Sequence, residues 1–470
     1  MSLETPTPPA PNAARGLFGG LLATLLLAGE MAWLWGYTVD DALISCRVAW
    51  HLARGLGYRF NATGPVVDAV TPLGWAHLLA LVGGTAGPLV TLLAAKWLGA
   101  LAVAGAGVAA GRRAFTRASA AYAGGLVLCL ALCAPLAAWA VSGMETGAVT
   151  ALAVAALGNG RWADLAAALA AALRPELAPW AVTVRVGLRV AQGVRFSRAL
   201  AGAGVVLAGP LLAAALRALW FGRPAPLAVF AKPSDFEHGV SYALHAFVQT
   251  GLPLLGVAPL ALRRGAPLAR ALVGAGLVHF AALALAGGDW MSLYRLAVPV
   301  LPSFVLVGAE LWRVAPAWAS WLRLACATAM SLYVARALGP TARQVGPARE
   351  RLIAEAAAPL AGAKTVATLD VGWVGAVADF TVVDLAGVTD EGVAMLPGGH
   401  TSKRVSDALL RARNVDALVL LSDRDTATPD DYVREVERRV ALADSVREFR
   451  VVARLPLGGT AQSYVVLRKP

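Results

Sequence analysis

Long apolar stretches recur along the first 340 residues and are separated by short segments rich in Arg, Gly and Pro. Runs of about 20 apolar residues are long enough to cross a bilayer as helices. The pattern therefore predicts an α-helical polytopic membrane protein with about 9 to 11 spans. Within it, the stretch 72–110 must cross an odd number of times. The stretch 163–184 has room only for a pair of half-length helices.

The pattern changes after residue 345, where apolar runs shorten to strand length and alternate with charged helical patterns. We expect helices near 402–413 and 430–442. This alternation predicts a C-terminal soluble α/β domain. The expected strands are 366–371, 381–385, 417–421, 450–455 and 464–467. The expected divisions are a disordered cytoplasmic tail at 1–16, a transmembrane domain at 17–340 and the α/β domain at 345–470.

Composition and charge fit a membrane protein better than a nucleic-acid-binding one. The chain is 58% hydrophobic and only 15% charged, whereas soluble chains carry about 25% charged residues. The net charge of +12 comes from Arg bunched between apolar runs, as the positive-inside rule predicts, so we expect no nucleic-acid partner. This bias places the N-terminus in the cytoplasm and the segments 37–61, 142–147, 221–241, 287–291 and 340–470 on the outer face of the cytoplasmic membrane.

The richest chemistry lies in the first outer segment, where Asp40 and Asp41 follow the first span. Adjacent carboxylates repel each other, which favours a raised pKa on one of them and suits a base that accepts a hydroxyl proton. Arg47, His51 and Arg54 then share one helical face and would present cations to lipid phosphates. Alternatively, the two acids only cap that helix and match its dipole.

A second polar segment follows a span that we expect to end on the same side. Asp289 and Arg295 flank Trp290 within Gly287–Arg295, although such a segment can also be an aromatic and Arg anchor at the interface. Weaker outer candidates supply further charges for a site. They are Glu145, which also suits a helix start, Arg174 and Glu176 in the half-length pair, and Lys232 in the 221–241 loop.

Several chemistries lack a motif in the sequence. The six histidines show no close metal-ligand spacing, and no Walker A or G-x-S-x-G motif is present. Gly372-Trp-Val-Gly375 falls short of a dinucleotide fingerprint. The paired acids also suit a divalent cation, but base catalysis needs none, so we expect no metal cofactor.

Taken together, these segments resemble the polyprenyl-phosphate-sugar-dependent glycosyltransferases of the GT-C fold, most closely the actinobacterial terminal arabinofuranosyltransferases of cell-wall assembly. The resemblance runs along nearly the whole chain. Its motifs are Asp40-Asp41-Ala-Leu-Ile-Ser-Cys-Arg47, Thr71-Pro-Leu-Gly-Trp75, Ser142-Gly-Met-Glu145-Thr, Arg174-Pro-Glu176, Phe230-Ala-Lys232, Gly287-Gly-Asp289-Trp-Met with Arg295, Asp370-x-Gly372 and Asp384-Leu-Ala-Gly387. The chain departs from the family at Leu43, where relatives have an aromatic residue, and at Asp68-Ala-Val, which leaves the sugar open.

The resemblance implies a GT-C-like transmembrane domain with a catalytic aspartate in the first outer loop, a role that we carry to Asp40 and Asp41. The donor would be a polyprenyl-phosphate-linked sugar in the lipid bilayer, and the acceptor a cell-envelope glycan or glycoconjugate. Arg47, Lys232 and Arg295 are then candidates for the donor phosphate, and Asp289 for its sugar hydroxyls. The competing interpretations are a transporter or flippase of lipid-linked sugars and a scaffold that binds envelope polymers.

Overall fold

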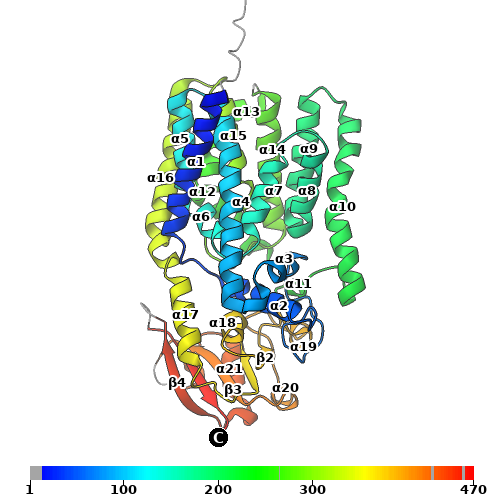
Figure 1. Ribbon diagram of the computed structural model, residues 1–470, viewed down its shortest axis with the longest axis vertical. Coiled ribbons are helices and arrows are strands. Elements are labelled where there is room, and N and C mark those ends of the chain that lie inside the picture. The colour runs from blue at the N-terminus through cyan, green and yellow to red at the C-terminus, as the bar shows by residue number, and fades with distance from the viewer. Residues whose placement is uncertain (1–12, 264, 425–427, 458–460) are drawn as a thin grey trace, which may run out of the picture.

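The computed structural model describes residues 13–263, 265–424, 428–457 and 461–470. An elongated bundle of helices carries a smaller α/β domain at one of its ends (Figure 1). This arrangement confirms the predicted fold class of a polytopic helical membrane protein with a C-terminal α/β domain. The expected disordered tail falls largely on residues 1–12, which lie outside the described residues, and the first helix already begins at Ala13.

Most of the bundle consists of helices that run roughly along its long axis (Figure 1). They are α1 (Ala13–Trp33), α4 (Pro88–Arg117), α5 (Ala120–Ala131), α6 (Ala134–Ala140), α7 (Thr146–Ala155), α8 (Arg161–Leu173), α9 (Ala178–Ala191), α10 (Phe196–Phe221), α12 (Phe236–Gln249), α13 (Pro259–Arg263), α14 (Pro267–Leu285), α15 (Leu301–Leu311) and α16 (Ala317–Ala342).

Fewer helices than expected have the length and hydropathy of a complete membrane span. Among the described residues, α1, α4, α10 and α14 do, and the pair α5 and α6, bent by 55°, would make a fifth. The expected 9 to 11 spans therefore exceed the count by this measure. The apolar runs are interrupted: α8 and α9 have 13 and 14 residues and meet at the turn Pro175–Leu177. That turn gives the half-length pair expected over 163–184. The helix α4 supplies a crossing in the region of 72–110, where an odd number of crossings is expected.

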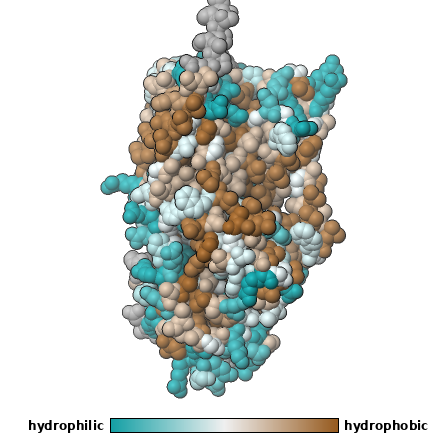
Figure 2. Space-filling view, viewed as in Figure 1, coloured by the Kyte–Doolittle hydropathy of each residue, from teal (hydrophilic) through white to brown (hydrophobic). Residues whose placement is uncertain are grey.

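The bundle exposes the apolar side chains that a bilayer would cover. Leu25, Leu211, Leu219 and Trp318 are each at least two-thirds exposed, and hydrophobic residues cover much of the side of the bundle in Figure 2. Hydrophilic residues gather at the end that carries the α/β domain. A surface of this kind would be unstable in water, so the chain is a multi-pass membrane protein.

Four short helices lie between the bundle and the α/β domain. They are α2 (Asp40–Ala53), α3 (Trp75–Val82), α11 (Leu227–Ala231) and α17 (Val345–Ala356). The helices α2 and α3 pack on the first turns of α4, while α17 continues from α16 into the α/β domain (Figure 1). Together they form the layer in which all the charged outer segments of the sequence analysis meet.

The C-terminal domain is built on a five-stranded mixed sheet with the order β2-β1-β3-β5-β4. The strands are β1 (Thr365–Thr368), β2 (Thr381–Asp384), β3 (Ala417–Ser422), β4 (Arg450–Pro456) and β5 (Ser463–Arg468). Its helices are α18 (Val371–Gly375), α19 (Glu391–Ala394), α20 (Asp407–Ala412) and α21 (Glu435–Ala441). The first three strands are parallel, and β5 runs antiparallel to β3 and β4. All five expected strands and both expected helices are therefore present.

Candidate functional site

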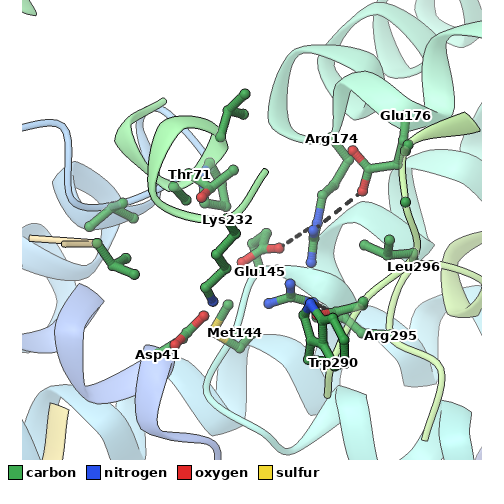
Figure 3. A pocket seen from close by; sticks show the side chains of 18 of the residues that line it. Asp41, Thr71, Met144, Glu145, Arg174, Glu176, Lys232, Trp290, Arg295 and Leu296 are labelled. Atoms are coloured by element: carbon green, nitrogen blue, oxygen red, sulfur yellow. Dashed lines mark hydrogen bonds and ion pairs between the residues drawn. The ribbon is translucent and has the colours of Figure 1, made fainter. Parts of the chain in front are cut away.

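A cavity of about 220 Å³ opens at the end of the bundle that faces the α/β domain. Residues far apart in the sequence line it, from α2, α11 and the loops that precede or follow the bundle helices. Seven of the nine charged candidates from the sequence are among them, and Figure 3 labels all of these except Asp289. They are Asp41, Glu145, Arg174, Glu176, Lys232, Asp289 and Arg295.

Two arginines in the cavity are held by carboxylates. The Arg174 Nε atom lies 2.7 Å from Glu145 Oε1, and its Nη1 lies 3.3 Å from Glu176 Oε1. The Arg295 Nε atom lies 2.8 Å from Asp289 Oδ2. Glu145 is fully buried, and apart from its ion pair with Arg174 neither of its carboxylate oxygens accepts a hydrogen bond from a described residue. A buried acid with unused acceptor capacity is costly unless a ligand hydroxyl or a water donates to it.

Asp41 and Lys232 differ from these pairs. Within the described part of the chain, neither side chain makes a hydrogen bond or an ion pair within 4 Å. Both point into the cavity and toward each other in Figure 3. The charge of Asp41 also reaches Arg295: although burial lowers the Arg295 pKa, the carboxylates of Asp289, Asp41 and Glu145 outweigh burial and raise it. The cavity thus holds one carboxylate and one ammonium that are available to a ligand.

An unusual backbone positions Asp289 and Arg295. Gly287 and Gly288 have φ values of 86° and 69°, and Leu293 and Tyr294 have φ values of 62° and 51°. A Cβ atom on Gly288 would lie 2.6 Å from the Cβ of Tyr242, so only glycine allows this close approach. Non-glycine residues rarely adopt positive φ, and two in succession indicate that the surrounding structure holds this loop in place.

The side chain of Trp139 contacts the loop that carries Asp289 and Arg295. Its indole N–H donates to the Leu293 carbonyl at 2.9 Å, and its ring lies under the Arg295 guanidinium at 5.6 Å. Trp139 is completely buried, so it fixes both the strained backbone and the cation. Sequence reasoning missed this residue because a Trp within an apolar run is indistinguishable from a packing residue.

Asp40, the other expected catalytic acid, does not line the cavity. Its carboxylate accepts hydrogen bonds from the backbone N–H groups of Gly372 (2.7 Å) and Trp373 (2.8 Å), the first turn of α18 in the C-terminal domain. A Cβ on Gly372 would collide with the Asp40 carbonyl, which explains this glycine without a nucleotide. Burial, and next the charge of Asp370, raise the pKa of Asp40 to about 7. Asp40 therefore binds the C-terminal domain and lies outside the cavity that Asp41 lines.

Arg47 also departs from its expected role as a phosphate-binding cation. It is completely buried, and its guanidinium donates to the carbonyls of Phe60 (2.8 Å), Ala378 (3.0 Å), Phe380 (2.7 Å) and Gly375. Each of its three nitrogen atoms therefore donates to a protein acceptor, and its burial keeps a ligand from reaching it.

The expected lipid-facing stripe of α2 is wrong for the same reason. His51 and Arg54 lie 3.3 Å and 2.8 Å from the carboxylate of Asp379, and Arg47 lies 3.7 Å from it. This cationic face of α2 docks the C-terminal domain and not a lipid surface. Sequence reasoning missed Asp379 because a single acid in a loop carries no pattern.

The departure from the family pattern at Asp68 also has a structural explanation. The Asp68 carboxylate pairs with the Nε of Arg217, near the end of α10, at 2.7 Å, and both side chains are buried. Arg217 also donates to the Thr71 carbonyl. This pair closes the cavity wall on the side of α10, since Thr71 lines the cavity.

The rim of the cavity combines apolar and polar surface. Val229 of α11 and Trp290 line it and are 56% and 61% exposed. Within the described residues, no group of three or more His, Cys, Asp or Glu side chains is arranged to hold a metal ion. The site is thus a cavity with four carboxylates and three cations beside an apolar entrance.

Comparison with known proteins covers only the C-terminal part of the chain. A family model described as a Domain of unknown function (DUF8728) matches residues 341–466. That range contains α17, the strands β1 to β4 and the first part of β5. No curated protein and no solved structure matches the chain.

Proposed function

We propose that the protein is a membrane glycosyltransferase that moves a sugar from a polyprenyl-phosphate donor to a glycan or glycoconjugate acceptor of the cell envelope. The observation that carries this proposal is the pairing of Asp41 and Lys232 in the cavity, each without a protein partner among the described residues and beside an apolar rim. A carboxylate and an ammonium at a membrane interface match the acceptor hydroxyl and the donor phosphate of this reaction. The resemblance to GT-C glycosyltransferases gives independent support.

In the proposed reaction, Asp41 accepts the proton of the acceptor hydroxyl as its oxygen bonds to the anomeric carbon of the sugar. The bond between that carbon and the phosphate oxygen breaks, and polyprenyl phosphate leaves with the electron pair. Lys232 and Arg295 stabilise the charge on the departing phosphate. A single displacement of this kind inverts the anomeric configuration, and no step requires a cofactor.

The remaining charged groups suit the donor sugar. Glu145, Glu176 and Asp289 offer carboxylate oxygens to sugar hydroxyls, while Arg174 and Arg295 hold these acids in fixed positions. Preorganised polar groups of this kind favour the transition state because they need no rearrangement during the reaction. The exposed Val229 would contact the first isoprene units of the donor.

The same arrangement favours an extracytoplasmic site in the cytoplasmic membrane. The helix α4 begins beside α2 and α3 and runs away from the C-terminal domain, so its last turns, with Arg112, Arg113 and Arg117, lie at the opposite end (Figure 1). Basic residues concentrate on the cytoplasmic side of membrane proteins. The cavity and the C-terminal domain would then face outward.

The decisive experiment follows a radiolabelled polyprenyl-phosphate sugar with the purified protein in proteoliposomes that also contain envelope glycan. Transfer of label to the glycan supports the proposal, and Asp41→Asn should reduce transfer by about 10²- to 10⁴-fold. Glu237→Gln, which changes an exposed carboxylate on α12, is the matched control and should transfer at the wild-type rate.

Two results would contradict the proposal. One is label that changes leaflet without leaving its lipid, which would identify a flippase. The other is transfer by Asp41→Asn at a rate within a few-fold of wild type, because the proposed base would then have no role.

A further inference from the structure

A second cavity, of about 630 Å³, lies between the bundle and the C-terminal domain. One wall is the bundle segment from Lys232 to Phe236 together with Trp290, and the other is the segment from Gly399 to Thr401. Lys232, Pro233, Ser234 and Trp290 line the first cavity too, so the two cavities share a wall. A ligand in the second cavity would contact Lys232, whose ammonium points toward Asp41 in the first cavity.

The shared wall carries an open aromatic surface. Trp290 stacks on His238 with ring centroids 3.9 Å apart and an interplanar angle of 11°, and His400 lies 5.8 Å from the Trp290 ring. The stack orients Trp290, while 61% of its surface remains exposed. An aromatic face held in one orientation and open to water is suited to the apolar face of a flat, polar ligand.

Polar groups surround this aromatic surface. Ser234, Asp235 and Thr401 supply hydroxyl and carboxylate oxygens, and Lys232 supplies an ammonium. Burial, and next the charge of Lys232, lower the pKa of His400 to about 4. Its imidazole is therefore neutral at physiological pH and both donates and accepts a hydrogen bond. Such a set suits a ligand whose edge carries many hydroxyl groups.

The segment of the C-terminal domain that supplies His400 is firmly held. The buried Lys403 ammonium donates to the carbonyls of Ala394 (2.7 Å) and Leu396 (3.1 Å), and the Val436 N–H donates to the Thr401 carbonyl at 3.0 Å. Gly398 has a φ of 105°, which lets the chain turn sharply. His400 is therefore presented by a preorganised loop, as a binding residue should be.

We propose that this second cavity binds the carbohydrate acceptor, with one sugar ring on Trp290 and its hydroxyls bonded to His400, Thr401 and Ser234. The proposal rests on the proposed function, in which the acceptor hydroxyl must reach Asp41 from the aqueous side. It assigns the C-terminal domain a direct part in acceptor recognition. The volume of the second cavity falls within the range of about 300–1,000 Å³ that is usual for ligand sites.

The test measures saccharide binding without donor and without turnover. Arabinofuranose, galactofuranose and mannopyranose tetrasaccharides are each titrated into the full chain in nanodiscs and followed by saturation-transfer difference NMR. At least one should bind, and His400→Ala and Trp290→Ala should each weaken its binding by about 10-fold or more. His245→Ala, which removes an exposed histidine of α12 outside both cavities, should bind as wild type.

The outcomes separate this proposal from the proposed function. Absence of binding by all three tetrasaccharides, or unchanged binding by both variants, overturns the acceptor site. Variants whose thermal midpoint equals that of wild type exclude misfolding as the cause of a loss. If a tetrasaccharide binds as expected but no label moves from the donor, the carbohydrate site stands while the transferase reaction fails.

Discussion

Two charged regions lie in the same layer between the bundle and the C-terminal domain, and they treat their charges differently. Where α2 meets that domain, the Asp40 carboxylate accepts two backbone N–H groups, and Arg47 donates to four carbonyls. Asp379 faces two arginines and the imidazole of His51. In the first cavity, which the same helix α2 lines, Asp41 and Lys232 have no such partner among the described residues.

The difference teaches that satisfied and unsatisfied charges have different consequences. A buried ionic group with all its hydrogen bonds made fixes one domain against another and has no capacity left for a ligand. A charged group that faces a cavity without a partner costs stability and is retained where a ligand completes it. Asp40 and Asp41 are adjacent in the sequence, yet they fall on opposite sides of this division.

The largest effect should separate these two acids. Asp41→Asn removes the proposed base and should lower transfer by about 10²- to 10⁴-fold, whereas Asp40→Asn should keep transfer within about 10-fold because an asparagine carbonyl still accepts one α18 N–H. Both are measured with the labelled donor at saturating acceptor. Equal losses of transfer in the two variants would contradict the different roles proposed for Asp40 and Asp41.

The next effect concerns stability and not activity. Arg47→Ala leaves four buried carbonyls without their donor and should destabilise the contact by about 3–5 kcal/mol, since each unsatisfied buried acceptor costs about 1–3 kcal/mol. The control is Arg54→Ala, which removes a partly exposed partner of the same Asp379 and should cost about 0–1 kcal/mol. Thermal unfolding and protease cleavage between α16 and α17 report the loss. Similar midpoints for the two variants would contradict full use of Arg47 in docking.

A smaller effect is expected for the cation of the cavity. Lys232→Ala should raise the donor KM by about 10- to 100-fold, since a hydrogen bond to a charged group contributes about 1.5–3 kcal/mol, and should leave the thermal midpoint unchanged. Lys232→Arg should restore most of the affinity because the charge is kept. Lys364→Ala, at an exposed lysine of the C-terminal domain, serves as the control. A donor KM that is unchanged in Lys232→Ala would exclude a phosphate contact.

The elements were largely predictable from local patterns. Period and length indicated the five strands, the short pair at 163–184 and the long apolar helices, because burial dictates these patterns along the chain. Fewer helices than the predicted 9 to 11 spans meet a length and hydropathy criterion among the described residues, because several apolar runs are interrupted within the bundle. Seven charged candidates meet in one cavity because each follows or precedes a helix end on the same side.

The assignments of Asp40 and Arg47 were not predictable in this way. Their partners, the α18 backbone and the carbonyls around residues 375–380, are more than 300 positions away in the sequence. Backbone groups leave no residue pattern that would reveal them. Gly372 and Gly375 were the nearest available signal, since glycines permit close backbone approach, but their spacing does not say which segment approaches them.

The smallest effect is a pH dependence of the docking contact. Burial and the charge of Asp370 raise the pKa of Asp40 from 3.8 to about 7, so the folded protein keeps a proton that the unfolded chain releases near pH 4. The resulting stabilisation is fully present below about pH 4, is lost as the pH rises to about 7, and does not change further above that. Asp370 titrates below this range, because its guanidinium partner Arg434 lowers its pKa.

His51 in the same contact changes the free energy of unfolding with the opposite sign, since burial lowers its pKa. The pH dependence of the total stability therefore does not report on Asp40 alone. The difference in thermal midpoint between wild type and Asp40→Asn does isolate it, because His51 is present in both. This difference should shrink by a few degrees between pH 4.5 and 7.5. The control is the difference in thermal midpoint between wild type and Glu237→Gln. If the difference in thermal midpoint between wild type and Asp40→Asn stays constant or grows between pH 4.5 and 7.5, the Asp40 carboxylate is ionised throughout the range. Its contact with α18 would then depend on charge and not on hydrogen bonding alone.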